Sequence, residues 1–443
     1  MRPLSAVRSR TWCSFVEPSL AERAQTVAVM VATALRDPAS VARTRHAGDG
    51  EQVSAGPEDF ASRAPTLAGG HTGIALLAAD LDVCLPGAGW DEVAHAHLVA
   101  AISNGLLLQR LGPSLHGGWA GLVYTADALS RGGRRYRRLL QRAETALTWQ
   151  TRRLASHVAR LDAPLSSHLI DLISGLSGIV AVLLVRRNRP EVQEVLLASL
   201  NALVSMVLRY HGRPPTIDAG DWWDAARGPM LNLGLAHGIP GLIASLSLAS
   251  MEGVKVEGQE DAIAMLVASL LRHQFYHDGA PTWPTAVAIE EESSASSTPA
   301  RTGWCYGAPG CARALWLAGD ALDCADWRTR AVEAVLAAFR MPPERRDVPS
   351  PTFCHGRAGL IHIGLRFAAD TGDLELQSMV LPELKQLVAE YDNTMRFGYR
   401  SLGYKGLKRD DPGLLDGAAG VALVLAAAAS SIEPSWDRVF LLS

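Results

Sequence analysis

The sequence is poor in several features that mark specialised classes of protein. Only six of its 443 residues are cysteine, too few in a chain of this length to suggest a disulfide framework. The net charge of −3 gives no support for a nucleic-acid-binding protein or for one held to an acidic membrane. No apolar segment follows the N-terminal arginines, so we expect no signal peptide. The longest apolar run, residues 418–429, is too short to cross a bilayer.

What the sequence does contain is typical of a large globular protein. Hydrophobic residues make up 48% of the chain and charged residues 20%, which is enough material for a sizeable core. Aromatic residues are only 6%, whereas alanine and leucine are plentiful, and this favours helices. No stretch has the composition of a domain linker. We therefore expect one domain over residues 1–443, with its core at about 60–430 and an outer helix and a connection in residues 1–60. Free cysteines fit a reducing cytoplasm.

A G-x-x-G motif followed by an apolar run recurs seven times. Successive second glycines are 48 to 69 residues apart, and a recurrence of this kind indicates a repeat architecture. Glycine allows the backbone to turn tightly and to approach its neighbours closely. The motifs occupy residues 70–73, 118–121, 175–178, 238–241, 307–310, 356–359 and 417–420.

Amphipathic segments separate the motifs. Their apolar residues recur at steps of three and four, which predicts helices with one buried face, whereas the segments after the glycines are apolar nearly all round and predict buried helices. The pattern predicts an all-α fold, an α/α toroid of seven outer and seven inner helices, whose G-x-x-G turns place helix N-termini around one mouth. The expected outer helices are residues 20–36, 93–109, 136–161, 190–210, 259–274, 326–341 and 373–391.

Two of the motifs follow a cysteine at the same position. Cys305 and Cys354 each lie two residues before the first glycine of their motif, and His355 is next to Cys354. Equivalent positions on neighbouring repeats can converge, and two thiolates with one imidazole are typical of a zinc site that keeps a fourth position open. The alternative is that both cysteines are core residues, since free cysteine is often buried. Cys311 lies inside the next predicted helix and is interpreted as a packing residue.

His237 lies immediately before the fourth glycine motif, at the position that His355 has before the sixth. Because the predicted ring places it at the same mouth as the predicted metal site, we interpret it as a general acid or base. Asp171 lies four residues before its motif and is expected either to orient His237 or to cap a helix. Arg301 is expected either to stabilise an oxyanion or to pair with the acidic residues 290–292. His71 and His116 also lie at glycine turns, but nothing else in the sequence supports a role for them.

These residues together resemble a known family. W-C-Y-G at residues 304–307, C-H-G-x-x-G at 354–359 and A-H-G-x-x-G at 236–241 are similar to the motifs of the lanthipeptide synthetase component C family, the lanthionine cyclases. The terminal L-L-D-G-A-A-G at residues 414–420 resembles the closing repeat of that family, and the likeness covers about residues 60–430. The resemblance implies a double α-barrel and one zinc ion bound by Cys305, Cys354 and His355. It also implies that His237, Asp171 and Arg301 act in catalysis, and it leaves the role of Tyr306 open.

The activity that the resemblance implies is formation of thioether rings, by addition of peptide cysteine thiols to dehydroalanine or dehydrobutyrine. The implied partner is a dehydrated precursor peptide. The chain has no dehydratase or kinase region, so a separate dehydratase is expected, and an export transporter could join a complex that associates peripherally with the membrane. The alternatives are a relative that adds glutathione and a non-catalytic scaffold stabilised by zinc. A toroidal glycosidase would need paired rim carboxylates, for which Asp171 and Asp416 are the only candidates that the sequence suggests.

Overall fold

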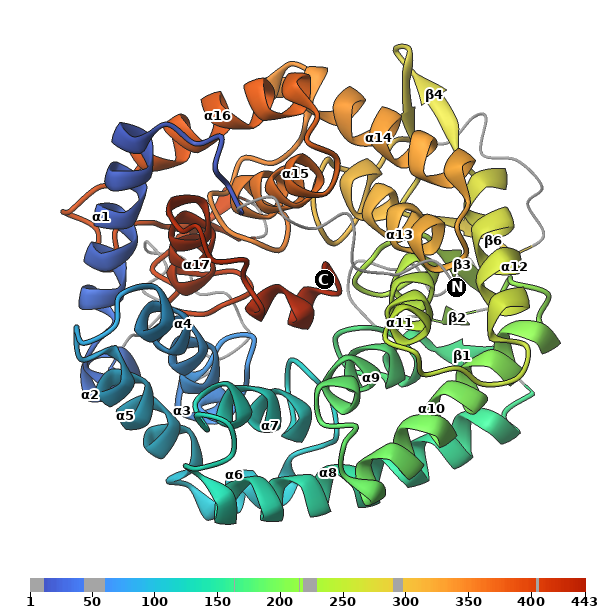
Figure 1. The fold of residues 1–443 in the computed structure, drawn as a ribbon, viewed down its shortest axis with the longest axis horizontal. Coiled ribbons are helices and arrows are strands. Elements are labelled where there is room, and N and C mark those ends of the chain that lie inside the picture. Colours follow the sequence, from blue (N-terminus) through green and yellow to red (C-terminus); the bar gives the residue numbers. More distant parts are fainter. Residues whose placement is uncertain are drawn as a thin grey trace.

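The computed structural model describes residues 12–43, 60–162, 164–214, 216–217, 229–289, 298–403 and 406–443. These residues form two concentric rings of helices, which alternate along the chain between the outer and the inner ring (Figure 1). The α/α toroid predicted from the repeated glycine motifs is therefore confirmed.

The inner ring is built from the apolar helices that follow the glycine motifs. Each of these helices begins directly after the first glycine of its motif, and most of its residues are buried. Neighbouring inner helices cover two sides and an outer helix covers a third, which explains why the segments are apolar all round. In chain order they are α4 (His71–Cys84), α7 (Trp119–Ala128), α9 (Leu176–Val185), α11 (Ile239–Met251), α13 (Ala308–Ala321), α15 (Arg357–Thr371) and α17 (Ala418–Ala429).

The outer ring consists of the amphipathic helices, and six of them lie within two residues of their predicted bounds. The prediction of one helix over residues 93–109 was wrong. The first helix ends at Ile102, and a separate helix, α6 (Gly105–Arg110), follows. The side chain of Asn104 accepts hydrogen bonds from the backbone N–H groups of Leu106 and Leu107 and so starts a new helix. The outer helices are α1 (Pro18–Ala34), α5 (Trp90–Ile102), α8 (Arg137–Arg160), α10 (Pro190–Arg209), α12 (Gln259–Arg272), α14 (Ala325–Arg340) and α16 (Leu374–Ala389).

Backbone hydrogen bonds join the seven turns that precede the inner helices into a closed circle, here called the rim. Each turn donates an N–H group to a carbonyl of the following turn, and the last turn donates to the first. These bonds need no particular side chain, so the rim can carry different chemistry on each repeat. The pairs, donor first, are Ala68–His116 (3.0 Å), His116–Ile173 (3.1 Å), Leu172–Ala236 (3.1 Å), Ala236–Cys305 (3.3 Å), Cys305–Cys354 (3.1 Å), Cys354–Leu415 (2.9 Å) and Leu415–Ala68 (2.9 Å).

The second glycine of each motif allows the turn and the inner helix to pack closely. At Gly178 an added Cβ atom would lie 1.9 Å from the carbonyl oxygen of Leu172, and at Gly359 it would lie 2.1 Å from that of Phe353. The other five second glycines face the equivalent carbonyl oxygen at 2.1 to 2.6 Å. All seven motifs therefore need glycine at this position for the same steric reason.

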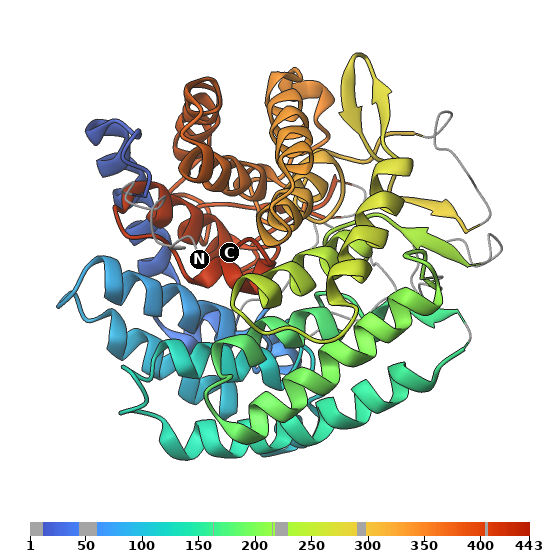
Figure 2. The same ribbon diagram turned by 45° about the vertical axis from the view of Figure 1, so that its right-hand side comes forward.

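Both ends of the described chain complete the ring. Helix α1 packs against α16 and α17, so an N-terminal outer helix covers the last inner helix. The C-terminal end lies within the ring in both views (Figures 1 and 2), where most of η5 (Trp436–Phe440) and the following Leu441 and Leu442 are buried. Trp304 Nε1 donates to the carbonyl oxygen of Phe440 at 3.1 Å, and Arg313 Nε donates to that of Leu442 at 2.8 Å. The C-terminal segment therefore plugs the centre of the barrel.

An ionic cluster fixes this plug to α15. Arg366 donates to both carboxylate oxygens of Asp437, and His362 Nε2 lies 2.8 Å from the same carboxylate. Burial by itself would raise the pKa of Asp437, but Arg366 and His362 hold it well below its usual range. The plug is therefore fastened by a buried carboxylate that stays ionised.

Short strands occupy several connections, which the sequence analysis did not predict. A four-stranded sheet has the order β1 (Leu165–Ser166), β2 (Thr216–Ile217), β3 (Met230–Asn232) and β6 (Ala286–Ala288). β4 (Phe275–His277) and β5 (Ala280–Thr282) form a hairpin that projects from the edge of the ring (Figures 1 and 2). A third pair joins β7 (Ser401–Leu402) and β8 (Lys408–Arg409). The remaining short helices are α2 (Pro38–Ala42), α3 (Phe60–Arg63), η1 (Ser167–Leu169) and η3 (Pro343–Arg345).

One helix of the described residues, α10, is long and apolar enough to cross a membrane if length and composition alone are considered. In the structure it belongs to the outer ring, where it packs against α8, α9 and α12, and 56% of its apolar window is buried. Its apolar character is thus accounted for by packing within the ring.

Candidate metal centre and active site

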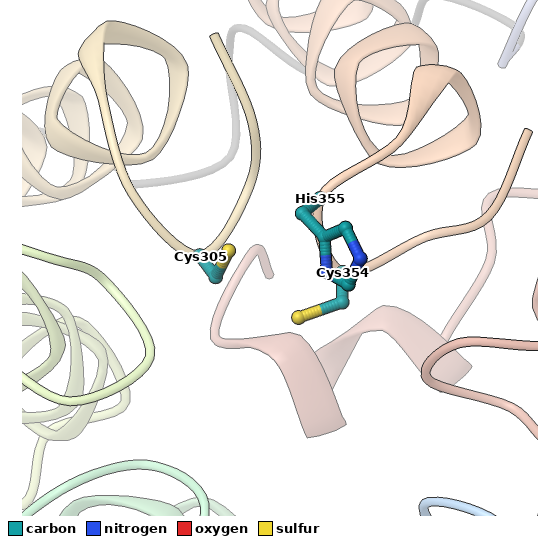
Figure 3. A group of neighbouring side chains, drawn as sticks. All are labelled: Cys305, Cys354 and His355. Carbon is teal, nitrogen blue, oxygen red and sulfur yellow. The ribbon is translucent and has the colours of Figure 1, made fainter. Parts of the chain in front are cut away.

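Cys305, Cys354 and His355 lie together on the rim, in the turns that lead into α13 and α15. One ligand atom from each of the three residues lies within 4.8 Å of the others. Figure 3 shows the Cys354 sulfur directed toward Cys305, with the His355 ring beside it. The Cys305 N–H donates to the carbonyl oxygen of Cys354 at 3.1 Å, so the rim hydrogen bonds hold the two turns at this separation.

This group has the composition and the spacing of a zinc site. Tetrahedral zinc with Zn–S bonds of about 2.3 Å would place two sulfur atoms about 3.8 Å apart, which agrees with ligand atoms that all lie within 4.8 Å of one another. Hydrogen bonding to Cys305 and burial raise the pKa of the Cys354 thiol well above its ordinary value. A cation that binds both sulfur atoms would remove this cost, because a coordinating metal deprotonates thiols. The donor set therefore fits zinc.

Gly307 shapes the first of the two cysteine turns. Its φ angle is +104°, and an added Cβ atom would lie 1.7 Å from the carbonyl oxygen of Arg301. It is the only first glycine among the seven motifs with a positive φ. The turn that carries Cys305 thus depends on glycine more strongly than the others do.

His237 and Asp171 form the second chemical group of the rim. His237 Nδ1 lies 2.6 Å from Asp171 Oδ2, while Asp171 Oδ1 accepts the N–H groups of Ser174 at 2.7 Å and Gly175 at 2.9 Å. Asp171 is buried, whereas the side chain of His237 is 22% exposed. A carboxylate held in this way can accept the Nδ1 proton of His237 and fix the orientation of the ring. Asp171 therefore lies where it can orient His237, and its other oxygen holds the turn before α9, although it makes no capping hydrogen bond to that helix.

Two further residues lie near this pair, and neither was predicted from the sequence. His168 Nδ1 lies 3.8 Å from Asp171 Oδ2, and its ring faces that of His237 edge-on at 6.2 Å. Asn232 Nδ2 donates to the hydroxyl oxygen of Tyr306 at 3.2 Å, and the Tyr306 ring stacks on that of His237 at 6.4 Å. His168 lies in η1, outside the glycine register, so no sequence signal marked it. Asn232 lies six residues before Gly238 in a strand that was not predicted.

Arg301 and Asp416 flank the metal group. Asp416 Oδ1 lies 3.4 Å from His355 Nδ1, as a carboxylate that orients a metal-binding histidine would. Arg301 is exposed, and its positive charge favours ionisation of both Cys354 and Asp416. The alternative partners expected for Arg301, residues 290–292, lie outside the described residues. As interpreted from the sequence, Cys311 lies in the core, where burial raises the pKa of its thiol.

The residues that immediately precede the first glycines divide the rim into two sides. The first three turns carry Gly69, Gly117 and Ser174 and are called the hollow side below. The last four turns form the functional side, whose residues at this position are His237, Tyr306, His355 and Asp416. One continuous set of backbone hydrogen bonds supports both sides.

Comparison with known proteins agrees with this arrangement. The profile of the family described as "Lanthionine synthetase C-like protein" matches residues 62–441. The chain belongs to the lanthionine synthetase C-like family. All six residues assigned above to the metal group, to the His237–Asp171 pair and to Arg301 lie within the matched part.

Two relatives show how far the likeness extends. The nisin biosynthesis protein NisC of Lactococcus lactis subsp. lactis is 23% identical over 407 residues, which cover 88% of this chain and 92% of the relative. The solved structure of a nisin cyclase matches with a TM-score of 0.74 and 22% identity, over 87% of this chain and 93% of that one. This lanthionine synthetase C-like protein therefore has the fold of the nisin cyclase.

Proposed function

We propose that this protein is a zinc-dependent lanthionine cyclase, which adds the cysteine thiols of a dehydrated precursor peptide to dehydroalanine or dehydrobutyrine residues. The observation that carries the proposal is the presence, on one rim, of a Cys–Cys–His group and of a histidine held by a buried carboxylate. The similarity to the nisin cyclase and to the nisin biosynthesis protein supports the same reaction class.

Cys305, Cys354 and His355 would hold the metal and leave one position for the substrate sulfur. A bound zinc ion would lower the pKa of the substrate thiol, which is ordinarily about 8.5, so that it ionises at neutral pH. Asp416 is placed to hold the His355 ring in a fixed orientation. Two cysteine thiolates supply negative charge to the site, which keeps the substrate sulfur nucleophilic.

His237 is the proton carrier in this proposal. Addition breaks the S–H bond and the alkene π bond, forms a C–S bond at the β-carbon and places a proton on the α-carbon, so no oxidant or reductant is needed. Nε2 of His237 accepts the thiol proton and returns a proton to the α-carbon. Asp171 keeps the other ring nitrogen protonated through its 2.6 Å contact and is thus a positioning residue.

Charge that develops on the enolate oxygen also needs stabilisation. Arg301 is the exposed cation next to the metal group and is assigned this role, together with N–H groups at the N-termini of the inner helices. Confinement of both reacting groups within the mouth of the toroid reduces the entropy that ring closure costs. The remaining expectations stay part of the proposal: one domain over residues 1–443, action in the cytoplasm, and partnership with a separate dehydratase and a transporter.

Thiol counting tests the proposed reaction directly. Cyclisation leaves the mass of a dehydrated peptide unchanged, so free cysteines are alkylated after incubation and counted by mass spectrometry. We expect the zinc-loaded protein to remove alkylatable thiols, and Cys305→Ala to lose both zinc and this activity. Unchanged thiols together with stoichiometric zinc would support a scaffold, whereas addition of supplied glutathione to the peptide would support the glutathione-adding alternative.

A further inference from the structure

A cavity of about 250 Å³ opens on the hollow side of the rim. The small residues Gly69, Gly117 and Ser174 line it, because these turns carry no large side chain where the functional side carries His237, Tyr306, His355 and Asp416. Pockets for drug-sized ligands measure roughly 300–1,000 Å³. The cavity is therefore suited to a residue or two of a peptide.

The cavity is linked to both chemical groups of the rim. Asp416 lines it and lies 3.4 Å from His355 of the metal group. Ser174 also lines it, and its N–H group donates to Asp171, the partner of His237. The cavity thus adjoins one residue that contacts the metal group and one that contacts the His237–Asp171 pair. The residue that accepts a thiol must occupy such a position, since its β-carbon meets sulfur and its α-carbon meets the proton donor.

The lining disfavours an anionic occupant and offers apolar surface. Ala68, Ile173 and Leu415 supply apolar surface. Arg63 and Asp411 of the wall lie 3.8 Å apart and compensate each other, and Asp416 adds a second carboxylate. An anionic side chain would therefore be repelled, whereas the small apolar side chain of a dehydrated residue fits the apolar part of the wall.

His116 lines the cavity, and its buried side chain has one unpartnered polar atom. It is 1% exposed, and its Nε2 lies 3.0 Å from the carbonyl oxygen of Val439, so Nε2 carries the proton. Burial lowers the pKa of His116 to about 4, which keeps the ring neutral at pH 7. Nδ1 is then a hydrogen-bond acceptor, and it has no partner among the described residues. A buried acceptor of this kind is suited to a peptide N–H group.

We propose that this cavity binds the dehydroalanine or dehydrobutyrine residue that accepts the thiol, and that the amide N–H of that residue donates to His116 Nδ1. The inference rests on the proposed function, and it adds a specificity-determining residue and a location for the second reactant. The thiol and the alkene would thus bind at adjoining positions of one rim, where sulfur can reach the β-carbon.

Gly117→Leu tests the location. An added Cβ atom at Gly117 meets nothing closer than Ser114 Oγ at 3.4 Å, so the backbone tolerates a side chain that would fill the cavity. Gly112→Leu is the matched control, since Gly112 belongs to the same loop, its added Cβ meets no atom within 4 Å, and it does not line the cavity. With a synthetic peptide carrying one cysteine and one dehydroalanine, we expect Gly117→Leu to lower kcat/KM for thiol loss at least tenfold, with zinc content unchanged. A normal rate in this variant would overturn the subsite while leaving the proposed function intact.

His116→Gln tests the hydrogen bond. A glutamine amide can still donate to Val439 but places no acceptor where Nδ1 was, and thermal unfolding checks that the plug remains in place. The probes are two non-reacting peptides in which alanine replaces the cysteine, one with an ordinary dehydroalanine and one with its amide nitrogen methylated. We expect His116→Gln to weaken binding of the first peptide about three- to tenfold and to leave binding of the second unchanged. Equal effects on both peptides, or none on either, would contradict the assignment.

The binding arm separates the two proposals. If the wild-type protein removes no thiols but binds the dehydroalanine peptide in a manner that Gly117→Leu abolishes, the cyclase proposal fails and the subsite stands. If it neither cyclises nor binds the peptide, both proposals fail.

Discussion

The functional side and the hollow side of the rim share one backbone and differ in what the backbone carries. Cys305 and Cys354 occupy the same position in their turns as His116 does on the hollow side, and all three residues take part in the same circle of hydrogen bonds. On the functional side these positions bring two sulfur atoms together, whereas on the hollow side the ring of His116 turns inward to the plug. The scaffold is therefore constant around the rim, and the choice of side chain at two positions per turn decides the chemistry.

Removal of a predicted metal ligand should have the largest effect of any change on the functional side. We expect Cys354→Ala to abolish zinc binding and to lower the rate of cyclisation by about a thousandfold or more, since a metal ion supplies several kcal/mol of stabilisation. Elemental analysis and thiol counting measure the two effects. Cys324→Ala, which removes a half-buried cysteine at the start of α14, is the matched control and should leave both unchanged. Full zinc retention by Cys354→Ala would refute the ligand assignment.

His237→Ala should separate proton transfer from metal binding. We expect it to retain zinc and to lower kcat by roughly 10²- to 10⁴-fold, as loss of a general acid–base group does. His168→Ala is the matched control, because His168 also lies beside Asp171 but is half exposed. It should cost only a few-fold. Equal losses in the two variants would show that Asp171, and not His237 in particular, is what the reaction needs.

The two sides should respond alike when the shared scaffold is damaged. Gly178→Ala on the hollow side and Gly359→Ala on the functional side each place a methyl group about 2 Å from a carbonyl oxygen. We expect each to lower the free energy of unfolding by about 2–3 kcal/mol, as overpacking does. Urea titration with zinc chelated measures the change. A much larger loss of unfolding free energy in one variant would show that the two repeats do not contribute equally to the stability of the ring.

Acid should weaken the fold through buried histidines that lie away from the metal group. Burial lowers the pKa of His71, His97 and His116 to about 4. Between pH 6.5 and about 4 the unfolded chain therefore binds more protons than the folded one, and stability falls as pH falls. For the fully buried His116, this difference in pKa would lower the free energy of unfolding by at most about 3 kcal/mol once the unfolded chain is fully protonated at this residue.

Asp80 opposes this trend, since burial and the charge of Asp437 raise its pKa to about 7. Its folded form keeps a proton that the unfolded form loses, so the stability that it contributes is present at low pH and is lost as pH rises toward 7. Denaturant unfolding between about pH 7 and pH 5 should show a shallower loss of stability in His116→Gln and a steeper loss in Asp80→Asn. Parallel profiles in all three proteins would contradict both assignments.

Much of the architecture could be read from local patterns. The start of α11 follows from the glycine at 238, and the bounds of α8 follow from its amphipathic period, because both depend on residues within one or two helical turns. The break at Asn104 was also local and could have been recognised from an asparagine cap. The strand around Leu231 was not predictable, since three residues carry no period and their pairing with Val287 spans a long connection.

The sequence by itself determined that seven equivalent turns exist and that two cysteines and two histidines stand at matching places in them. It also placed the inner helices, because each glycine motif specifies its own helix start. Only the tertiary structure decided that the circle closes through Leu415 and Ala68, that His168 joins the His237–Asp171 pair, and that the C-terminal segment turns back to contact His116. These contacts join residues far apart in the chain, and they form only when burial and hydrogen bonding around the whole ring offset the entropy of closing it.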